Sequence, residues 1–174
     1  MDIKRLLGML SRERDNTVRA RLRYVNTVTV EHIRNGKVLS VQKQKNLIVY
    51  TGMNWLCGIM GNAQAAPAAY IALTSNATAV ALTDTTTTWN SYEYDTNGLS
   101  RALGTYAHTT DTDNFTLEYT WTCSADSQTV AKTGLFNAST KNNGTLFAAV
   151  VLSSSVTLMT NDQLKVTWTV DLGL

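Results

Sequence analysis

Two segments alternate large apolar residues with polar ones, and this period of two constrains the fold more than any other feature. One runs from Phe115 to Cys123 and the other from Leu164 to Leu172. The intervening positions are mostly threonines, whose β-branched side chains favour extended backbone. Because successive side chains of a strand point to opposite faces, both segments predict half-buried antiparallel strands with a threonine-rich outer face. We expect Trp121 and Trp168 to lie in the core.

Turn signals divide the rest of the chain into further strands. Asn35-Gly36 is the strongest hairpin signal, because both central positions of a type I′ turn need positive φ. It predicts strands at about Tyr24–Arg34 and Lys37–Lys45. Clusters of Asn, Asp and Gly bound shorter runs that also read as strands. These runs are Tyr70–Thr74, Ser100–His108, Thr129–Asn137 and Thr145–Leu152.

Two other segments have helical spacing. The segment Tyr50–Met60 places four apolar or thiol side chains on one face, and Gly61 closes it. The segment from Asp2 to about Arg14 carries a narrow apolar stripe at i, i+3, i+4 and i+7, formed by Ile3, Leu6, Leu7 and Leu10. A helix this short needs a surface for its stripe. Its own domain, a neighbouring subunit and a lipid interface are all open.

These elements predict a mainly β protein. We expect an antiparallel β-sandwich with one short packed helix and a basic, helical N-terminal arm. The arm would span residues 1–23 and the sandwich body residues 24–174. Within the body we expect a hairpin at 24–45, a helix at 50–60 and strands over 70–172.

The charge is distributed unevenly, although the net charge is only +2. Residues 1–50 contain eleven of the fifteen Lys and Arg residues but four of the thirteen Asp and Glu residues. The candidate partner-binding residues of the arm are Lys4, Arg5, Arg12, Arg14, Arg19, Arg21 and Arg23. An extended Arg19–Arg23 segment would form a basic ridge for an acidic protein surface, for nucleic-acid phosphate or simply for solvent. Few aromatic residues interleave the ridge, so base stacking is not indicated.

We expect no catalytic site, no metal and no cofactor. His32 and His108 have no second histidine or cysteine at ligand spacing. The segment Asp111–Asn114 begins like a calcium loop, but Phe115 takes the next ligand position, and a hairpin turn fits better. Cys57 and Cys123 are far apart, and we expect Cys123 to be a buried, reduced thiol. We expect no secretory signal and no membrane anchor.

One cluster of aromatic residues suggests a different class of protein. The stretch WNSYEY brings Trp89, Tyr92 and Tyr94 into an expected loop. Exposed rings of this kind form platforms for sugars. A small carbohydrate-binding or adhesin β-sandwich is therefore an alternative to a structural role.

The order of several motifs resembles a family of tailed-bacteriophage virion proteins, described as tail-fibre-like, collar or head-decorating. The resemblance covers about residues 25–172 and rests on NGKVL, NLIVYTGMNWLCGIM, YIALTSNATAVALTDTTT, GLSRALGTY, TGLFNAST, GTLFAAVV and DQLKVTWTVDL. It implies a non-enzymatic structural subunit of a virion, assembled in the host bacterial cytoplasm.

The resemblance also implies partners. These would be other virion proteins, such as the major capsid protein or neck and tail proteins, and further copies of the chain, without a membrane and without nucleic acid as a main partner. No fibre shaft follows the last strand motif, so we expect a capsid decoration or cement protein that docks through its basic arm. A neck, collar or tail-fibre adaptor protein is the alternative.

Overall fold

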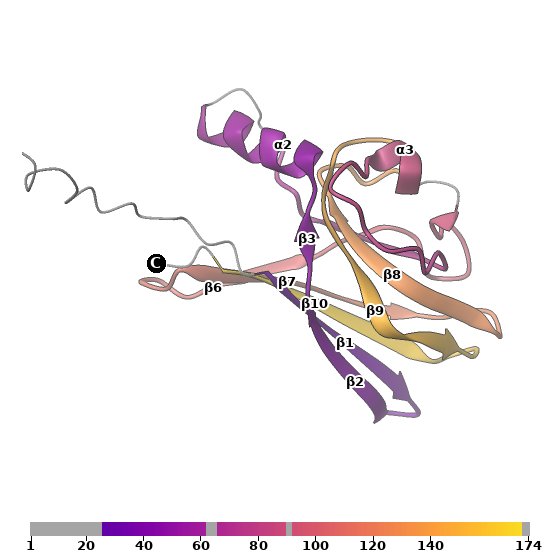
Figure 1. The fold of residues 1–174 in the computed structure, drawn as a ribbon. Coiled ribbons are helices and arrows are strands. Elements are labelled where there is room, and N and C mark those ends of the chain that lie inside the picture. Colours follow the sequence, from indigo (N-terminus) through magenta and orange to yellow (C-terminus); the bar gives the residue numbers. More distant parts are fainter. Residues whose placement is uncertain (1–25, 62–65, 90–91, 172–174) are drawn as a thin grey trace, which may run out of the picture.

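The computed structural model describes residues 26–61, 66–89 and 92–171, which form two antiparallel five-stranded sheets (Figure 1). Sheet A has the order β2 (Lys37–Lys45), β1 (Thr27–Arg34), β10 (Gln163–Asp171), β7 (Asn114–Thr122) and β6 (Thr105–His108). Sheet B has the order β3 (Leu47–Ile48), β9 (Leu146–Leu158), β8 (Gln128–Phe136), β4 (Tyr70–Thr74) and β5 (Ala102–Leu103). The helices are α2 (Tyr50–Met60) and α3 (Thr86–Trp89). The mainly β fold predicted from the sequence is confirmed, whereas the predicted helical arm lies outside the described residues.

Sheet A shows the alternation that the sequence predicts. Along β10 every second side chain is buried, and Trp168 is fully buried between the sheets. Trp121 of β7 is also in the core, and its Nε1 donates a hydrogen bond to the carbonyl of Ser100 at 2.7 Å. The opposite face carries a ladder of threonines, with Thr27 opposite Thr169 and Thr169 opposite Thr116.

The turn between β1 and β2 is at Asn35-Gly36, as the sequence predicts. Asn35 and Gly36 have φ of 51° and 73°, as a type I′ turn requires. Helix α2 also has the predicted bounds. The predicted strands Tyr70–Thr74 and Thr129–Asn137 correspond to β4 and β8, and β9 continues to Leu158, beyond the predicted end at Leu152.

The prediction of one strand over Ser100–His108 is wrong. The segment contains β5 in sheet B and β6 in sheet A, so the chain passes from one sheet to the other at Gly104. A Cβ at this glycine would lie 3.2 Å from side-chain atoms of both Ile71 and Leu117, which belong to different sheets. The crossing therefore uses a residue without a side chain, because the two sheets approach each other here.

The threonine- and alanine-rich stretch after β4 builds a second, smaller core. Trp89 at the end of α3 packs edge-on against Phe136 of β8, with ring centroids 5.6 Å apart. A Cβ at Gly134 would lie 2.8 Å from the Trp89 ring, so β8 leaves room for the indole. The buried members of this second core are Val49, Ala72, Trp89, Phe136, Leu146 and Ala149.

Both cysteines have free thiols. Cys123 is buried, as predicted, and its Sγ lies 3.1 Å from the carbonyl oxygen of Ala125. Cys57 is exposed on α2. Neither helix in the described part of the chain has the length and apolarity needed to cross a membrane.

Helix α2 is fixed to the sandwich by its first turn. Gly52 is its buried residue, and it lies against the backbone of β9 at Phe147. The hydroxyl of Thr51 donates to the carbonyl of Leu146 at 2.8 Å. In the next turn Trp55 and Leu56 pack against the core, whereas the end of the helix projects beyond the sheets (Figure 1), and Met60 is 76% exposed.

Gly52→Ala should therefore destabilise the protein, although alanine favours a helix. The added Cβ would overlap the carbonyl group of Phe147, which belongs to a strand and cannot move freely. Overpacking of this kind costs about 1–3 kcal/mol, more than the gain of about 1 kcal/mol in helix propensity. Urea unfolding measures the difference. Asn54→Ala, at an exposed position of the same helix, is the control and should be neutral or slightly stabilising.

Candidate partner-binding surfaces

An apolar cleft opens at the end of the sandwich that α2 crosses. Its volume is about 590 Å³. The floor consists of core residues from both sheets, with Leu117 and Val170 from sheet A and Leu135 and Phe147 from sheet B. The walls are α2 on one side and Tyr106 of β6 on the other. The hydrophobic core is thus continuous with an open surface at this end.

The cleft has the chemistry of a site for apolar side chains. Met60 and Tyr106 on its walls are 76% and 61% exposed, so large apolar side chains face solvent around the opening. Trp55 packs edge-on against Phe147 at 5.5 Å, and its buried Nε1 has no hydrogen-bond partner among the described residues. A concave apolar surface of this size is the usual form of a binding pocket.

An acidic turn lies beside the cleft. The β6–β7 hairpin turns through Asp111 and Asp113, and Asp111 has a φ of 65°. Phe115, two residues after Asp113, lines the cleft and stands opposite Val170 in the sheet. Apolar lining and negative charge therefore adjoin each other.

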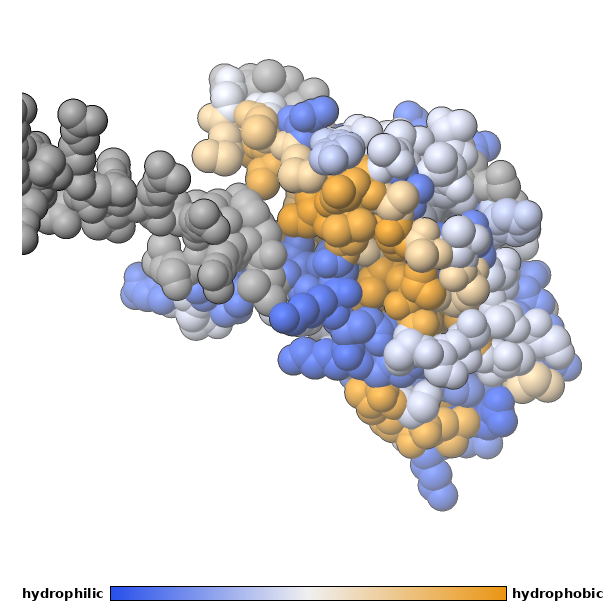
Figure 2. Space-filling model, in the orientation of Figure 1, coloured by the Kyte–Doolittle hydropathy of each residue, from blue (hydrophilic) through white to orange (hydrophobic). Residues whose placement is uncertain are grey.

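The second candidate surface is strand β2 at the edge of sheet A. Val38, Leu39 and Val41 are 51%, 52% and 59% exposed, and no strand in the described residues pairs with the outer edge of β2. Figure 2 shows hydrophobic residues gathered on the β1–β2 hairpin. An exposed apolar edge strand is a ready surface for pairing with another chain.

Gln42 joins this edge strand to sheet B. Its amide nitrogen donates to the carbonyl of Ser154 at 2.7 Å, and its amide oxygen accepts from the backbone nitrogen of Ser154 at 3.0 Å. The hydroxyl of Ser153 also donates to the amide oxygen at 2.8 Å. These bonds hold the hairpin against β9 and fix the position of the exposed edge.

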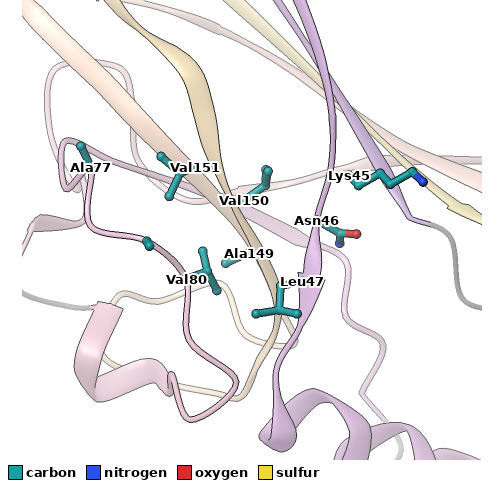
Figure 3. Close-up of a pocket in the computed structure, with 9 residues that line it drawn as sticks. Lys45, Asn46, Leu47, Ala77, Val80, Ala149, Val150 and Val151 are labelled. Atoms are coloured by element: carbon teal, nitrogen blue, oxygen red, sulfur yellow. The ribbon is translucent and has the colours of Figure 1, made fainter.

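A shallower groove of about 360 Å³ lies between β3, β9 and the loop after β4 (Figure 3). Leu47 and Val80 face each other across Ala149, and Lys45 and Asn46 stand at one end. Small aliphatic side chains dominate the lining. The groove therefore offers shape and apolar contact, with one cation at its rim.

At the other end of β10, Arg34 and His32 contact the buried carboxylate of Asp162. Arg34 donates from Nε and Nη2 to the two carboxylate oxygens of Asp162, each at 2.7 Å, and His32 Nε2 lies 2.9 Å from Asp162 Oδ2. The backbone nitrogen of Met159 donates to the same carboxylate at 2.8 Å. The Arg34 hydrogen bonds, more than any other contact, hold the pKa of Asp162 well below its ordinary range. This arrangement fastens the hairpin to the β9–β10 turn.

A second buried ion pair joins two loops. Arg101 donates from Nε and Nη2 to the carboxylate of Glu93, each at 2.8 Å, and its guanidinium lies 3.9 Å from the Phe136 ring centroid. Its Nη1 donates to the backbone carbonyls of Ala138 and Asn143. Both side chains are fully engaged within the fold, which makes this pair structural.

The structure separates the three aromatic residues of the possible ligand platform. Trp89 is 4% exposed and belongs to the second core, so the expectation that it is an exposed ring is wrong. Tyr94 is partly buried, and its hydroxyl donates to the carbonyl of Thr129 at 2.9 Å. Tyr92, at 59% exposure, is the member whose ring faces solvent freely.

The candidate partner-binding residues of the arm, from Lys4 to Arg23, lie outside the described residues. Within the described ranges, no three His, Cys, Asp or Glu side chains come together as a metal site would require. Sequence reasoning did not identify the cleft or the β2 edge. The edge had a signal, because the apolar residues of VLSV lie between lysines directly after the hairpin turn.

No family model, no curated protein and no solved structure matches this chain. The class that the coordinates define is a two-sheet antiparallel β-sandwich with one open end and one apolar edge strand.

Asp162→Asn should lower stability at neutral pH and flatten the loss of stability in acid. A carboxyl whose pKa is lowered in the folded state stabilises the fold above its ordinary pKa of about 4. That contribution is lost as the pH falls through the lowered folded pKa. We expect a cost of about 1–3 kcal/mol at pH 7, because a buried charged acceptor is replaced by a neutral amide.

Urea unfolding between pH 7 and pH 2 measures both effects. Asp95→Asn removes an exposed carboxylate that pairs with Lys141 at 3.2 Å and is the control. It should change stability by less than about 1 kcal/mol. An Asp162→Asn protein with the acid sensitivity of the original chain would contradict the assigned role of the cluster.

Proposed function

We propose that this chain is a non-enzymatic structural subunit of a tailed-phage particle, in the form of a capsid decoration or cement protein. The observation that carries the proposal is the exposed apolar edge strand β2, with Val38, Leu39 and Val41 open to contact. A subunit that works in many copies needs a surface that other chains can cover. The resemblance to phage virion proteins supports the same role.

The chemistry of the edge suits a controlled contact. Lysines at positions 37, 43 and 45 flank the apolar residues of β2, and lysine on an edge strand opposes unlimited sheet growth. The three Gln42 hydrogen bonds hold the edge against β9, so a partner would meet an ordered surface. Such an edge favours one defined neighbour over continuous stacking.

In this proposal the basic arm supplies the attachment to the particle. Arginines of the arm would pair with acidic groups on the major capsid protein or on neck proteins, and these are Arg12, Arg14, Arg19, Arg21 and Arg23. Surface charge complementarity speeds association and selects the partner, while the apolar edge contributes the buried area.

A neck, collar or tail-fibre adaptor would use the same two surfaces in a small ring. The copy number in purified particles, measured by quantitative mass spectrometry against the major capsid protein, separates the alternatives. Shell symmetry gives on the order of hundreds of copies and a cyclic ring roughly three to twelve. Absence from particles would refute the virion role.

Of the three aromatic residues proposed for a carbohydrate site, Tyr92 is the one that is freely exposed. Quenching of tryptophan fluorescence by added sugar would support this alternative.

The double variant Leu39→Glu/Val41→Glu should enter particles about tenfold less often than the original chain. Charges on the edge strand oppose its burial against another protein. Tyr92→Glu introduces one such charge at an equally exposed aromatic residue away from β2, and it should be incorporated normally. Equal incorporation of the edge variant would contradict the use of β2 as an assembly surface.

The triple variant Arg19→Glu/Arg21→Glu/Arg23→Glu should lose incorporation while its body stays folded. Acidic residues at these positions repel the acidic partner surface that the proposal requires. The matched triple lysine variant keeps the charge and should retain most of the incorporation. Quantitative mass spectrometry of particles gives the result, and circular dichroism confirms folding. A glutamate variant that is incorporated normally would refute anchoring by the arm.

A further inference from the structure

We propose that the apolar cleft beside α2 is filled by the N-terminal segment of the same chain, with Ile3, Leu6, Leu7 and Leu10 packed on its lining. This inference does not rest on a role in a phage particle. It follows from an incomplete core, an apolar stripe of matching character and the place where the chain enters the sandwich.

The cleft is an opening in the main core. Its floor residues Leu117, Leu135 and Phe147 are buried members of the core cluster, whereas Met60 and Tyr106 on its walls are mostly exposed. Covering these side chains with aliphatic groups removes apolar surface from water on both partners. Exposed apolar surface that continues a core favours an apolar occupant.

The spacing of positions 3, 6, 7 and 10 would place four aliphatic side chains on one side of a helix. A helix over residues 3–10 is about 12 Å long, from 1.5 Å per residue. A segment this short does not stay helical alone in water. It needs an apolar surface of the kind that the cleft provides.

The chain enters the sandwich at the same end as the cleft. Thr27, the first residue of β1, stands opposite Thr169, and the next residue of β10, Val170, forms part of the cleft floor. Residues 11–25 connect the stripe to this point. At about 3.3 Å per residue, this tether spans up to roughly 50 Å when extended, so the stripe can reach the cleft with slack to spare.

Buried side-chain amides lie near the point where the N-terminal segment joins β1. Asn26, one residue before β1, is buried, and both polar atoms of its side chain have no partner in the described part of the chain. Its backbone carbonyl accepts from the backbone nitrogen of Asn46, whose own side-chain nitrogen also has no partner there. Buried polar groups are normally paired, so these amides offer hydrogen bonds to the backbone of the segment leading into the cleft.

Charge supports the same placement. Lys4 lies next to Ile3 in the sequence, and Asp111 and Asp113 lie in the turn beside the cleft. A cation at the edge of the stripe would face these carboxylates. Charge complementarity of this kind fixes the orientation of an apolar contact more than its strength.

The tether selects the same chain over a second copy. A covalent tether of this length holds the stripe at an effective concentration on the order of millimolar near its own cleft. At micromolar protein concentration, the stripe of another molecule cannot compete.

Disulfide trapping in the purified full-length chain tests the proposal. Leu7→Cys is combined with Met60→Cys in a Cys57→Ser background, and Met60 is exposed, so its replacement spares the core. We expect an intramolecular disulfide under mild oxidation, at a rate at least about tenfold above that of the control Arg5→Cys/Met60→Cys. Residue 5 is about 200° around the helix from residue 3, away from the stripe.

Each other outcome overturns the proposal. Disulfides between chains would make a second copy the occupant, and equal rates for Leu7→Cys and Arg5→Cys would mean that the stripe does not face α2.

A second measurement avoids engineered thiols. Leu6→Glu/Leu7→Glu should raise the binding of a fluorescent apolar dye severalfold, whereas Arg14→Glu should not. Unchanged dye binding would show that the segment does not cover the cleft. Neither experiment involves particles, so their failure is distinct from failure of the proposed function.

Discussion

Sheet A depends on the pairing of β10 with two partners, β1 on one side and β7 on the other. The buried side of β10 carries Trp168 at the centre of the core. One end of the strand, at Val170, contributes to the floor of the open cleft. At the other end, Asp162 in the preceding turn holds Arg34 of the hairpin. This strand therefore contributes to the core and to the cleft, and the turn before it carries the carboxylate of the charge cluster.

Several cations of the body form ion pairs within the fold. Arg34, Arg101 and Lys165 each contact a carboxylate within 3.0 Å. Lys132 is buried near the Trp89 ring, and burial lowers its pKa. The lysines of β2 are different, because they flank an exposed apolar edge. The positive charge available to a partner is thus concentrated on this edge and in the sequence that precedes β1.

The sequence predicted the strands well wherever burial has a period of two. The positions of β1, β7 and β10 followed from alternation, because these strands have one inner and one outer face. The position of β2, which is mostly exposed, followed from the Asn-Gly turn. The segment Ser100–His108 was predicted as one strand because all its residues suit a strand. The chain passes from sheet B to sheet A at Gly104, and this crossing depends on packing between the sheets. Trp89 looked like a loop residue, since the local sequence does not reveal that the outer face of sheet B needs a cover. The cleft was not predictable, because its lining comes from segments far apart in the chain.

The pairing of the first described strand with the last also sets an order of events during synthesis. His32 and Asp162 are 130 residues apart, so β1 must wait for β10 to emerge before its second edge is covered. At ribosomal speeds of about 5–20 residues per second, the wait is on the order of ten seconds. The Asn35-Gly36 turn lets β1 and β2 meet within microseconds. A nascent chain would thus carry a preformed hairpin whose apolar residues stay exposed until the final strand arrives, and that interval is when it is most open to chaperones and to aggregation.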